Sequence, residues 1–111
     1  MTGSTEVWVA QACTLPTVQR PLRLAEFDAL FAHGLTAQER VSPTVLRWTL
    51  DPGVEMAARD LTERETACCS FFTFDFTIGA QAVQLEVAVP PALVEVLDAL
   101  AARAAVGLAT A

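Results

Sequence analysis

Lysine is absent from this chain, and basic residues of any kind are few. The 111 residues include 7 Lys+Arg, all of them arginine, against 13 Asp+Glu, so the formal net charge is −6 at pH 7. A nucleic-acid-binding domain is expected to carry a clustered basic face, and anionic membranes attract helices rich in basic residues. The charge balance therefore argues against both nucleic acid and a membrane surface as partners.

Long uncharged stretches are missing as well. No run of about 18 residues, the length that crosses a bilayer, is free of charge. The first 13 residues contain neither a basic stretch nor a long apolar stretch, so we expect no signal peptide. These absences predict a cytoplasmic protein whose thiols stay reduced.

The composition predicts one folded domain. Apolar residues make up 53% of the chain and charged residues 18%, which supplies enough apolar surface for a core and excludes a disordered chain. At roughly 100–200 residues per domain, the length corresponds to a single domain. We expect this domain to span residues 1–111, with loose ends at 1–4 and 107–111.

Hydrophobic periodicity predicts four strands and three helices. Period-two alternation predicts strands at residues 6–13, 45–50, 71–78 and 83–89, the last two forming a hairpin. Helical spacing with Pro or Asp start signals predicts helices at 21–33, at 52–68 and from 91 onward. A capping-box pattern at 36–39 predicts one further short helical turn. The order β-α-β-α-β-β-α indicates an α+β two-layer sandwich, in which a mostly antiparallel four-stranded sheet carries helices on one face.

Cysteine is scarce, and its three copies are Cys13, Cys68 and Cys69. An odd number of thiols in a reducing compartment argues against a disulfide framework. Adjacent thiols suit a soft ion such as mercury(II) or a trivalent arsenical, because thiolate is a soft ligand. Structural zinc takes four ligands, often from CxxC pairs, and this chain has no such pair. The sequence therefore predicts a soft-metal site at the adjacent pair, with Cys13 as a third ligand if the strand at 6–13 lies beside the strand at 71–78.

Two other interpretations of the cysteines stay open. Buried cysteine behaves as a small hydrophobic residue, so the thiols can be packing residues of an interaction or homodimerisation module. A thiol nucleophile is favoured at a helix N-terminus or beside a cation. Cys68 and Cys69 instead stand at the C-terminal end of a predicted helix, close to Glu65, which disfavours a free thiolate. A bound soft cation reverses that disadvantage, because it replaces the thiol proton.

Few other residues offer chemistry. The sequence has no glycine-rich phosphate loop, no zinc-protease motif and no Ser-His-Asp set. His33, the only histidine, is expected to lie in solvent or to cap the end of a helix. Asp75 alternates with Phe74 and Phe76, so it is expected to face solvent or, alternatively, to serve as a proton donor near the thiols. The phenylalanines themselves are expected to pack in the core.

The stretch RETACCSFFTF at residues 64–74 resembles a pattern of small bacterial proteins in which an acidic residue precedes two adjacent cysteines and a run of aromatic residues. Cys-Thr-Leu-Pro at 13–16 and Glu-Phe-Asp-x-Leu-Phe at 26–31 resemble the front of the same proteins. These proteins are associated with mercury-type metal-response regulators. The resemblance therefore implies metal binding in resistance or sensing.

A fainter resemblance is to organomercurial lyase, which uses two cysteines and an aspartate. It implies that Cys68 or Cys69 holds mercury together with Cys13, and that Asp75 supplies the proton to the carbon leaving group. The chain is much shorter than that enzyme, and it has Pro16 where the lyase pattern has an aspartate. The sequence alone thus supports three hypotheses: a soft-metal-binding protein, a small thiol-dependent enzyme, and an interaction module.

Overall fold

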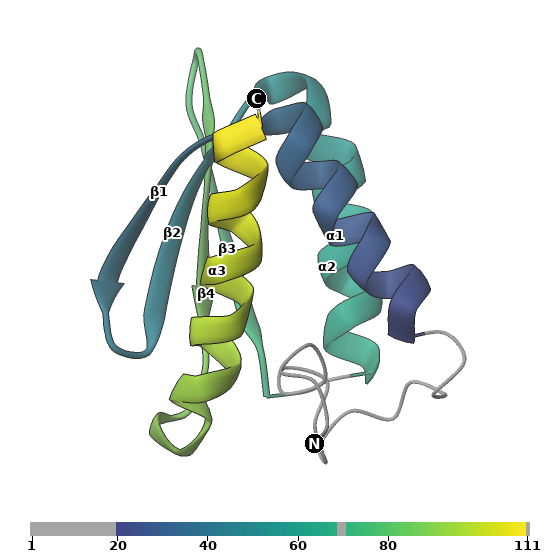
Figure 1. The fold of residues 1–111 in the computed structure, drawn as a ribbon. Helices are drawn as coiled ribbons and strands as arrows, with labels where there is room; N and C mark the ends of the chain where they lie inside the picture. Colours follow the sequence, from purple (N-terminus) through teal and green to yellow (C-terminus); the bar gives the residue numbers. More distant parts are fainter. Residues whose placement is uncertain (1–19, 69–70, 111) are drawn as a thin grey trace.

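The computed structural model describes residues 20–68 and 71–110 of the chain (Figure 1). Helices and strands make up most of this part. The helices are α1 (Arg20–Gly34), α2 (Glu55–Cys68) and α3 (Val94–Thr110), the strands are β1 (Leu35–Ser42), β2 (Val45–Leu50), β3 (Thr73–Ile78) and β4 (Val83–Ala88), and the short 3-10 turns η3 (Pro52–Val54) and η4 (Pro91–Leu93) precede α2 and α3.

The four strands form one sheet in the order β1-β2-β4-β3, and every neighbouring pair is antiparallel. The three helices lie on one side of this sheet (Figure 1). Helix α3 lies against β1 and β2, and α1 contacts both α3 and α2. Helix α2 reaches the far edge of the sheet, where the guanidinium carbon of Arg59 lies 4.5 Å from the centre of the Phe76 ring. The predicted α+β sandwich with helices on one face is confirmed.

The core forms where alternate strand residues meet the apolar sides of the helices. Period-two alternation turns Leu46, Trp48 and Leu50 of β2 inward, and all three are buried. The Trp48 ring meets the Phe31 ring of α1 edge to face, with 4.9 Å between the ring centres. Its indole N–H donates a hydrogen bond of 2.7 Å to the Gln38 side chain, so the one polar atom of this large side chain is satisfied.

The start of α2 follows directly from the sequence. The Asp51 carboxylate accepts a hydrogen bond of 2.8 Å from the Gly53 N–H, and Pro52 occupies the first position of η3. Proline fits this position because the N–H that it lacks would have no partner in the helix. The Asp51 N–H also donates to the Gly34 carbonyl at 2.8 Å, which ties the end of α1 to the start of α2. The predicted cap and proline start are confirmed.

The helical turn expected at 36–39 is wrong, because these residues belong to strand β1. The Thr36 hydroxyl donates to the Thr49 carbonyl of β2 at 3.1 Å instead of capping a helix. Leu35 is buried, and Gln38 faces Trp48 across the β1–β2 pair. Pairing with β2 therefore overrides a local capping pattern, which is worth about 1 kcal/mol at most positions.

The expectation for the start of the chain is not tested by the described residues, whereas the expectation for its end is not met. The strand expected at 6–13 lies outside the described residues. The loose end expected from Gly107 is not observed as far as Thr110, because α3 continues to that residue. A Cβ placed on Gly107 would lie 2.6 Å from the Phe31 Cβ, so the two helix backbones approach closely here. That contact gives the last turns of α3 a packing partner.

Candidate functional site

The end of α2 is the part of the structure that leads into the cysteine pair. Cys68 is the last residue of the helix, and Glu65 stands one turn before it. The Glu65 side chain is completely buried, which is rare for a carboxylate. Residues three and four apart share a helix face, so Glu65 stands on the same buried face of α2 as Leu61 and Ala58.

The burial of Glu65 was not predicted, although the sequence carried a signal for it. Glu65 follows Ala58 and Leu61 at the spacing of the apolar stripe of α2, and both of these residues are buried. The side chain of Thr62, also buried, donates to the Ala58 carbonyl at 2.9 Å. An acidic residue in register with an apolar stripe is a sign of a buried carboxylate, because its neighbours on that face are in the core.

Aromatic side chains lie directly beyond the cysteine pair. Phe72 is buried, and its ring centre lies 4.6 Å from that of Phe71 and 5.3 Å from that of Phe74. Phe71, Phe74 and Phe76 are half-buried and pack against the core. The expectation that these phenylalanines are packing residues is confirmed.

The start of α1 lies at the same end of the helix layer as the end of α2. The two helices run antiparallel (Figure 1), and Glu26 of α1 accepts a hydrogen bond of 3.0 Å from Arg64 of α2. At the opposite end, Gly34 approaches Val54 so closely that an added Cβ would collide with its side chain. Arg20 and Cys68 are therefore at one end of the molecule, together with the start of β3.

The residues singled out from the sequence fall into three groups. Cys13 and Cys69 lie outside the described residues, and the side chain of Cys68 is not described. His33 lies exposed in the last turn of α1, where its Nδ1 donates to the Ala29 carbonyl at 2.7 Å, as expected of a helix-end histidine. Within residues 20–68 and 71–110, no group of three or more His, Cys, Asp or Glu is arranged to hold a metal ion.

Asp75 lies on the face of the sheet opposite the helices. It is exposed, and it stands directly opposite Glu86 of β4. Phe74 and Phe76, its neighbours along β3, are turned toward the helix layer instead. The side chain of Asp75 therefore points away from the layer that contains α2.

The open face carries a row of charges across all four strands. Glu39, Arg47, Glu86 and Asp75 stand side by side in the register of the sheet. Arg47 contacts Glu86 at 2.8 Å and Glu39 at 3.4 Å. The hydrogen bond to Glu86 raises the pKa of the Arg47 guanidinium above its ordinary value. A raised pKa stabilises the fold at every pH below the ordinary arginine value, and this stabilisation is lost only in strongly alkaline solution.

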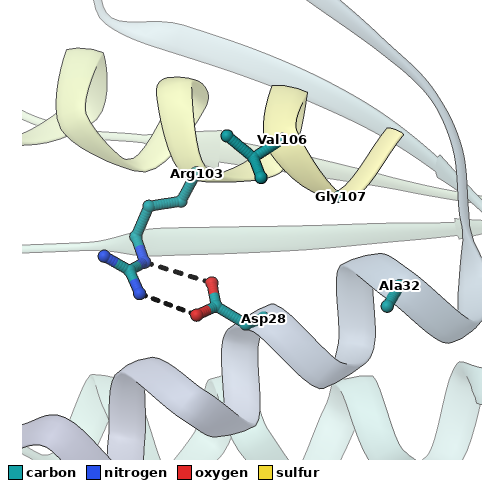
Figure 2. Close-up of a pocket in the computed structure, with 5 residues that line it drawn as sticks. All are labelled: Asp28, Ala32, Arg103, Val106 and Gly107. Atoms are coloured by element: carbon teal, nitrogen blue, oxygen red, sulfur yellow. Dashed lines mark hydrogen bonds and ion pairs between the residues drawn. The ribbon is translucent and has the colours of Figure 1, made fainter. Parts of the chain in front are cut away.

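Two of the hollows among residues 20–68 and 71–110 lie between helices. One, of about 400 Å³, lies between α1 and α3. There the Arg103 guanidinium donates two hydrogen bonds, of 2.7 and 3.1 Å, to the Asp28 carboxylate (Figure 2). The other, of about 320 Å³, lies between α1 and α2. There Arg64 bonds to Glu26 and to Asp60, and the bond to Glu26 is the main cause of a raised pKa of Arg64. In both hollows the arginine side chain already forms ion pairs with carboxylates of the same chain.

Comparison with known proteins found no matching family model, no matching curated protein and no matching solved structure. In the part of the chain that the structure describes, no helix combines the length and the apolar character needed to cross a bilayer. A functional conclusion must therefore come from the residues of this chain.

Proposed function

We propose that the protein is a cytoplasmic, thiol-based binder of a soft metal ion, mercury-like or arsenite-like, that serves metal resistance or sensing. Cys68 and Cys69 are the primary ligands, and Cys13 is the third. The observation that carries the proposal is the adjacent thiol pair at the end of α2, one turn after the completely buried Glu65.

The chemistry of this helix end favours a bound cation over a reactive thiolate. The C-terminal end of a helix carries partial negative charge, and a carboxylate stands one turn away. Both disfavour a free anionic sulfur, and both favour a metal cation that replaces the thiol proton. Glu65 acts in this proposal as a positioning residue whose packing shapes the helix end, and it is not a ligand.

The position of the start of α1 supports Cys13 as the third ligand. The described chain starts at Arg20, at the same end of the helix layer as Cys68 (Figure 1). Cys13 precedes Arg20 by seven residues, and seven extended residues span roughly 23–25 Å at most. A two- or three-thiolate site of this kind suits mercury(II) or arsenite better than zinc, which prefers four ligands.

The two other hypotheses have less support. A lyase-like enzyme needs an acid beside the thiols, whereas the side chain of Asp75 points away from the helix layer to which Cys68 belongs. An interaction module with buried cysteines would use an apolar surface for homodimerisation. Val106 on α3 is exposed, although the α1–α3 hollow beside it also contains the Asp28–Arg103 ion pair.

Native mass spectrometry of the reduced protein with stoichiometric mercury(II), zinc(II) or arsenite tests the proposal. We expect one mercury or arsenite per chain, retained in the wild type and lost in the Cys68→Ser/Cys69→Ser variant. The Cys13→Ser variant should retain the ion more weakly. Ala67→Ser is the matched control, because it places a hydroxyl at the adjacent exposed position and removes no thiol.

The remaining outcomes separate the hypotheses. Equal retention of the ion by the wild type and the double serine variant would overturn the proposal. Thiols that react with a thiol reagent only after unfolding would favour the packing interpretation. Turnover of an organomercurial substrate, abolished by Asp75→Asn with metal binding intact, would favour the enzyme.

A further inference from the structure

The two edges of the sheet differ in how well they are protected against a further strand. The edge strand β1 has irregular register at two places, between Leu35 and Ala37 and between Arg40 and Ser42. Such irregularities, together with charged side chains, are the usual means by which proteins block edge-to-edge pairing. Glu39 and Arg40 supply the charges at the middle of β1.

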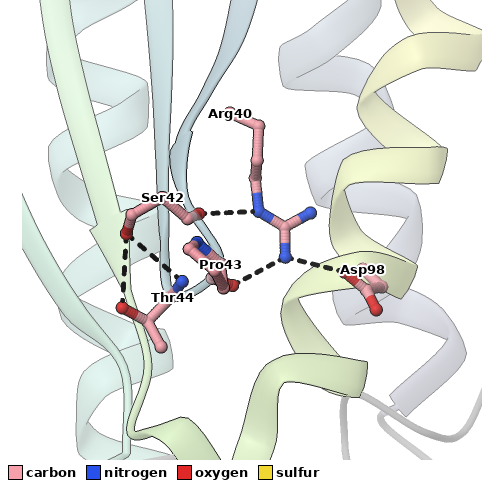
Figure 3. A network of polar contacts seen from close by, with 5 residues as sticks. All are labelled: Arg40, Ser42, Pro43, Thr44 and Asp98. Carbon is pink, nitrogen blue, oxygen red and sulfur yellow. Dashed lines mark hydrogen bonds and ion pairs between the residues drawn. The ribbon is translucent and has the colours of Figure 1, made fainter.

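Arg40 also fastens the end of β1 to the rest of the fold (Figure 3). Its guanidinium donates to the Ser42 carbonyl at 3.1 Å, to the Pro43 carbonyl at 2.7 Å and to Asp98 of α3 at 2.7 Å. Gln38 donates to the Ala101 carbonyl of α3 at 3.1 Å. This edge is bent, charged and held against α3, so it is a poor template for another strand.

Among the described residues, the opposite edge, β3, lacks the register shifts of β1, and Asp75 is its one charged side chain. Its register with β4 is unbroken from Thr73 to Ile78. The hairpin is closed by the Gly79 N–H, which donates to the Ala82 carbonyl at 2.9 Å. Because backbone groups alternate in direction along an antiparallel strand, those of Phe74, Phe76 and Ile78 then point to the edge that no other described strand pairs with.

The side chains of β3 also leave apolar surface at this edge. Phe74 and Phe76 face the helices but stay half-buried, and Ile78 is 52% exposed. The corresponding inward residues of β2 and β4 are buried. A strand added beside β3 would cover these side chains and pair the free backbone groups in a single step.

The chain itself supplies a segment with the required pattern. Residues 6–13 alternate with apolar side chains on both faces, Val7, Val9 and Cys13 on one and Trp8, Ala10 and Ala12 on the other. This pattern predicts a strand flanked by structure. Six residues, 14–19, connect the segment to α1, and they span roughly 20 Å when extended. Neighbouring packed helices are about 8–10 Å apart, so the connection is long enough to pass the end of α2.

We propose that residues 6–13 add to the free edge of β3 as a fifth, antiparallel strand. Helix α1 starts at the end of the molecule where β3 begins, and in this proposal the segment reaches that same end with Cys13. A strand that ends where β3 starts runs antiparallel to it, like every other pair in the sheet. This arrangement brings Cys13 toward the junction between α2 and β3.

Charge favours this occupant over a second copy of the chain. Two copies paired through antiparallel β3 strands would bring the Asp75 and Glu86 side chains of each copy close to those of the other on the open face. Like charges opposite each other on a sheet are destabilising. Residues 7–13 contain no charged side chain, so the segment meets Asp75 without this repulsion.

Residue-resolved hydrogen exchange by NMR on the full chain, without metal, tests the proposal. We expect slow exchange at the amides of Phe74, Phe76 and Ile78. The Val9→Pro/Ala10→Pro variant should accelerate it by about tenfold or more, since each lost hydrogen bond changes local opening by about that factor. Adjacent prolines are used because neighbouring N–H groups point to opposite sides of a strand, so one proline must remove a bond to β3. Gly3→Pro/Ser4→Pro is the matched control outside the segment and should change nothing.

Several results would overturn the proposal. These are fast exchange of the β3 edge amides in the wild type, unchanged protection in the proline variant, or protection that appears only at concentrations where sedimentation shows a dimer. Exchange of the β4 amides monitors whether the proline variant is folded. If it is not, acrylamide quenching of the wild type against Trp8→Phe gives a second measurement, in which a fully accessible Trp8 contradicts docking. Because no metal is present, failure of metal binding leaves this test unaffected.

Discussion

Strands β2 and β3 show the same alternation of apolar and polar residues, yet they occupy very different surroundings. The inward side chains of β2 are buried, with Trp48 and Leu50 at 0% exposure, whereas Phe74 and Phe76 of β3 stay half-buried. Strand β2 lies between two partners and beneath α3, while β3 has β4 on one side and α2 above it. The half of the molecule around β2 is thus tightly packed. The half around β3 is packed less completely and contains the candidate thiol site.

The largest expected difference between the two halves is in the cost of removing a large side chain. Trp48→Ala should lower the free energy of unfolding by about 3–5 kcal/mol, because it leaves a cavity and removes the hydrogen-bond donor to the Gln38 side-chain oxygen. Phe76→Ala should cost about 1–2 kcal/mol, because the Phe76 ring is only partly removed from water. Denaturant titration of both variants measures this difference. Equal losses would contradict the division into a packed and an open half.

A smaller effect should come from the contact between α1 and α3. Gly107→Ala should lower the free energy of unfolding by about 1–3 kcal/mol through overpacking, because the new Cβ would lie 2.6 Å from the Phe31 Cβ. Helix propensity alone predicts the opposite sign, a gain of about 0.8–1 kcal/mol for alanine over glycine. Ala102→Gly at an exposed position of the same helix measures that propensity directly. A stabilised Gly107→Ala variant would show that the two backbones are less closely packed.

The smallest effect should come from the open face. Asp75→Asn removes a like charge directly opposite Glu86, and it should raise the free energy of unfolding by about 0.5 kcal/mol or less. The gain should shrink at 1 M salt, where the Debye length is about 3 Å. Unfolding measured at low and high salt provides the comparison. Destabilisation by this substitution would instead indicate a specific contact of the Asp75 carboxylate.

Local sequence patterns predicted most of the elements correctly. The helix at 21–33, the strand at 45–50 and the hairpin from 71 to 89 correspond to α1, β2 and the β3–β4 pair within one or two residues at most ends. Each of these segments has a clear hydrophobic period and a Gly or Pro at its ends. The Asp51 cap was predicted for the same reason, since its chemistry depends on residues next to it in the chain.

Strand β1 and the burial of Glu65 could not be predicted in the same way. The β1 sequence, LTAQERVS, is polar and has a capping pattern, and it becomes a strand through its register with β2. Glu65 is an acidic residue by type, and its burial depends on α2 packing over the sheet. For the candidate site, the sequence predicted the thiol residues and their chemistry, while their mutual distances depend on strand order.

The sequence by itself determined the α+β class, the antiparallel hairpin, the start of α2 and the presence of an adjacent thiol pair at a helix end. These features depend on neighbouring residues, whose interactions are fixed by chain connectivity. Only the tertiary structure decided that β3 is the outermost of the four described strands on its side, that Asp75 faces away from the helices, and that α1 starts where α2 ends. These relations join residues far apart in the chain, so they depend on which packing of the elements buries the most apolar surface.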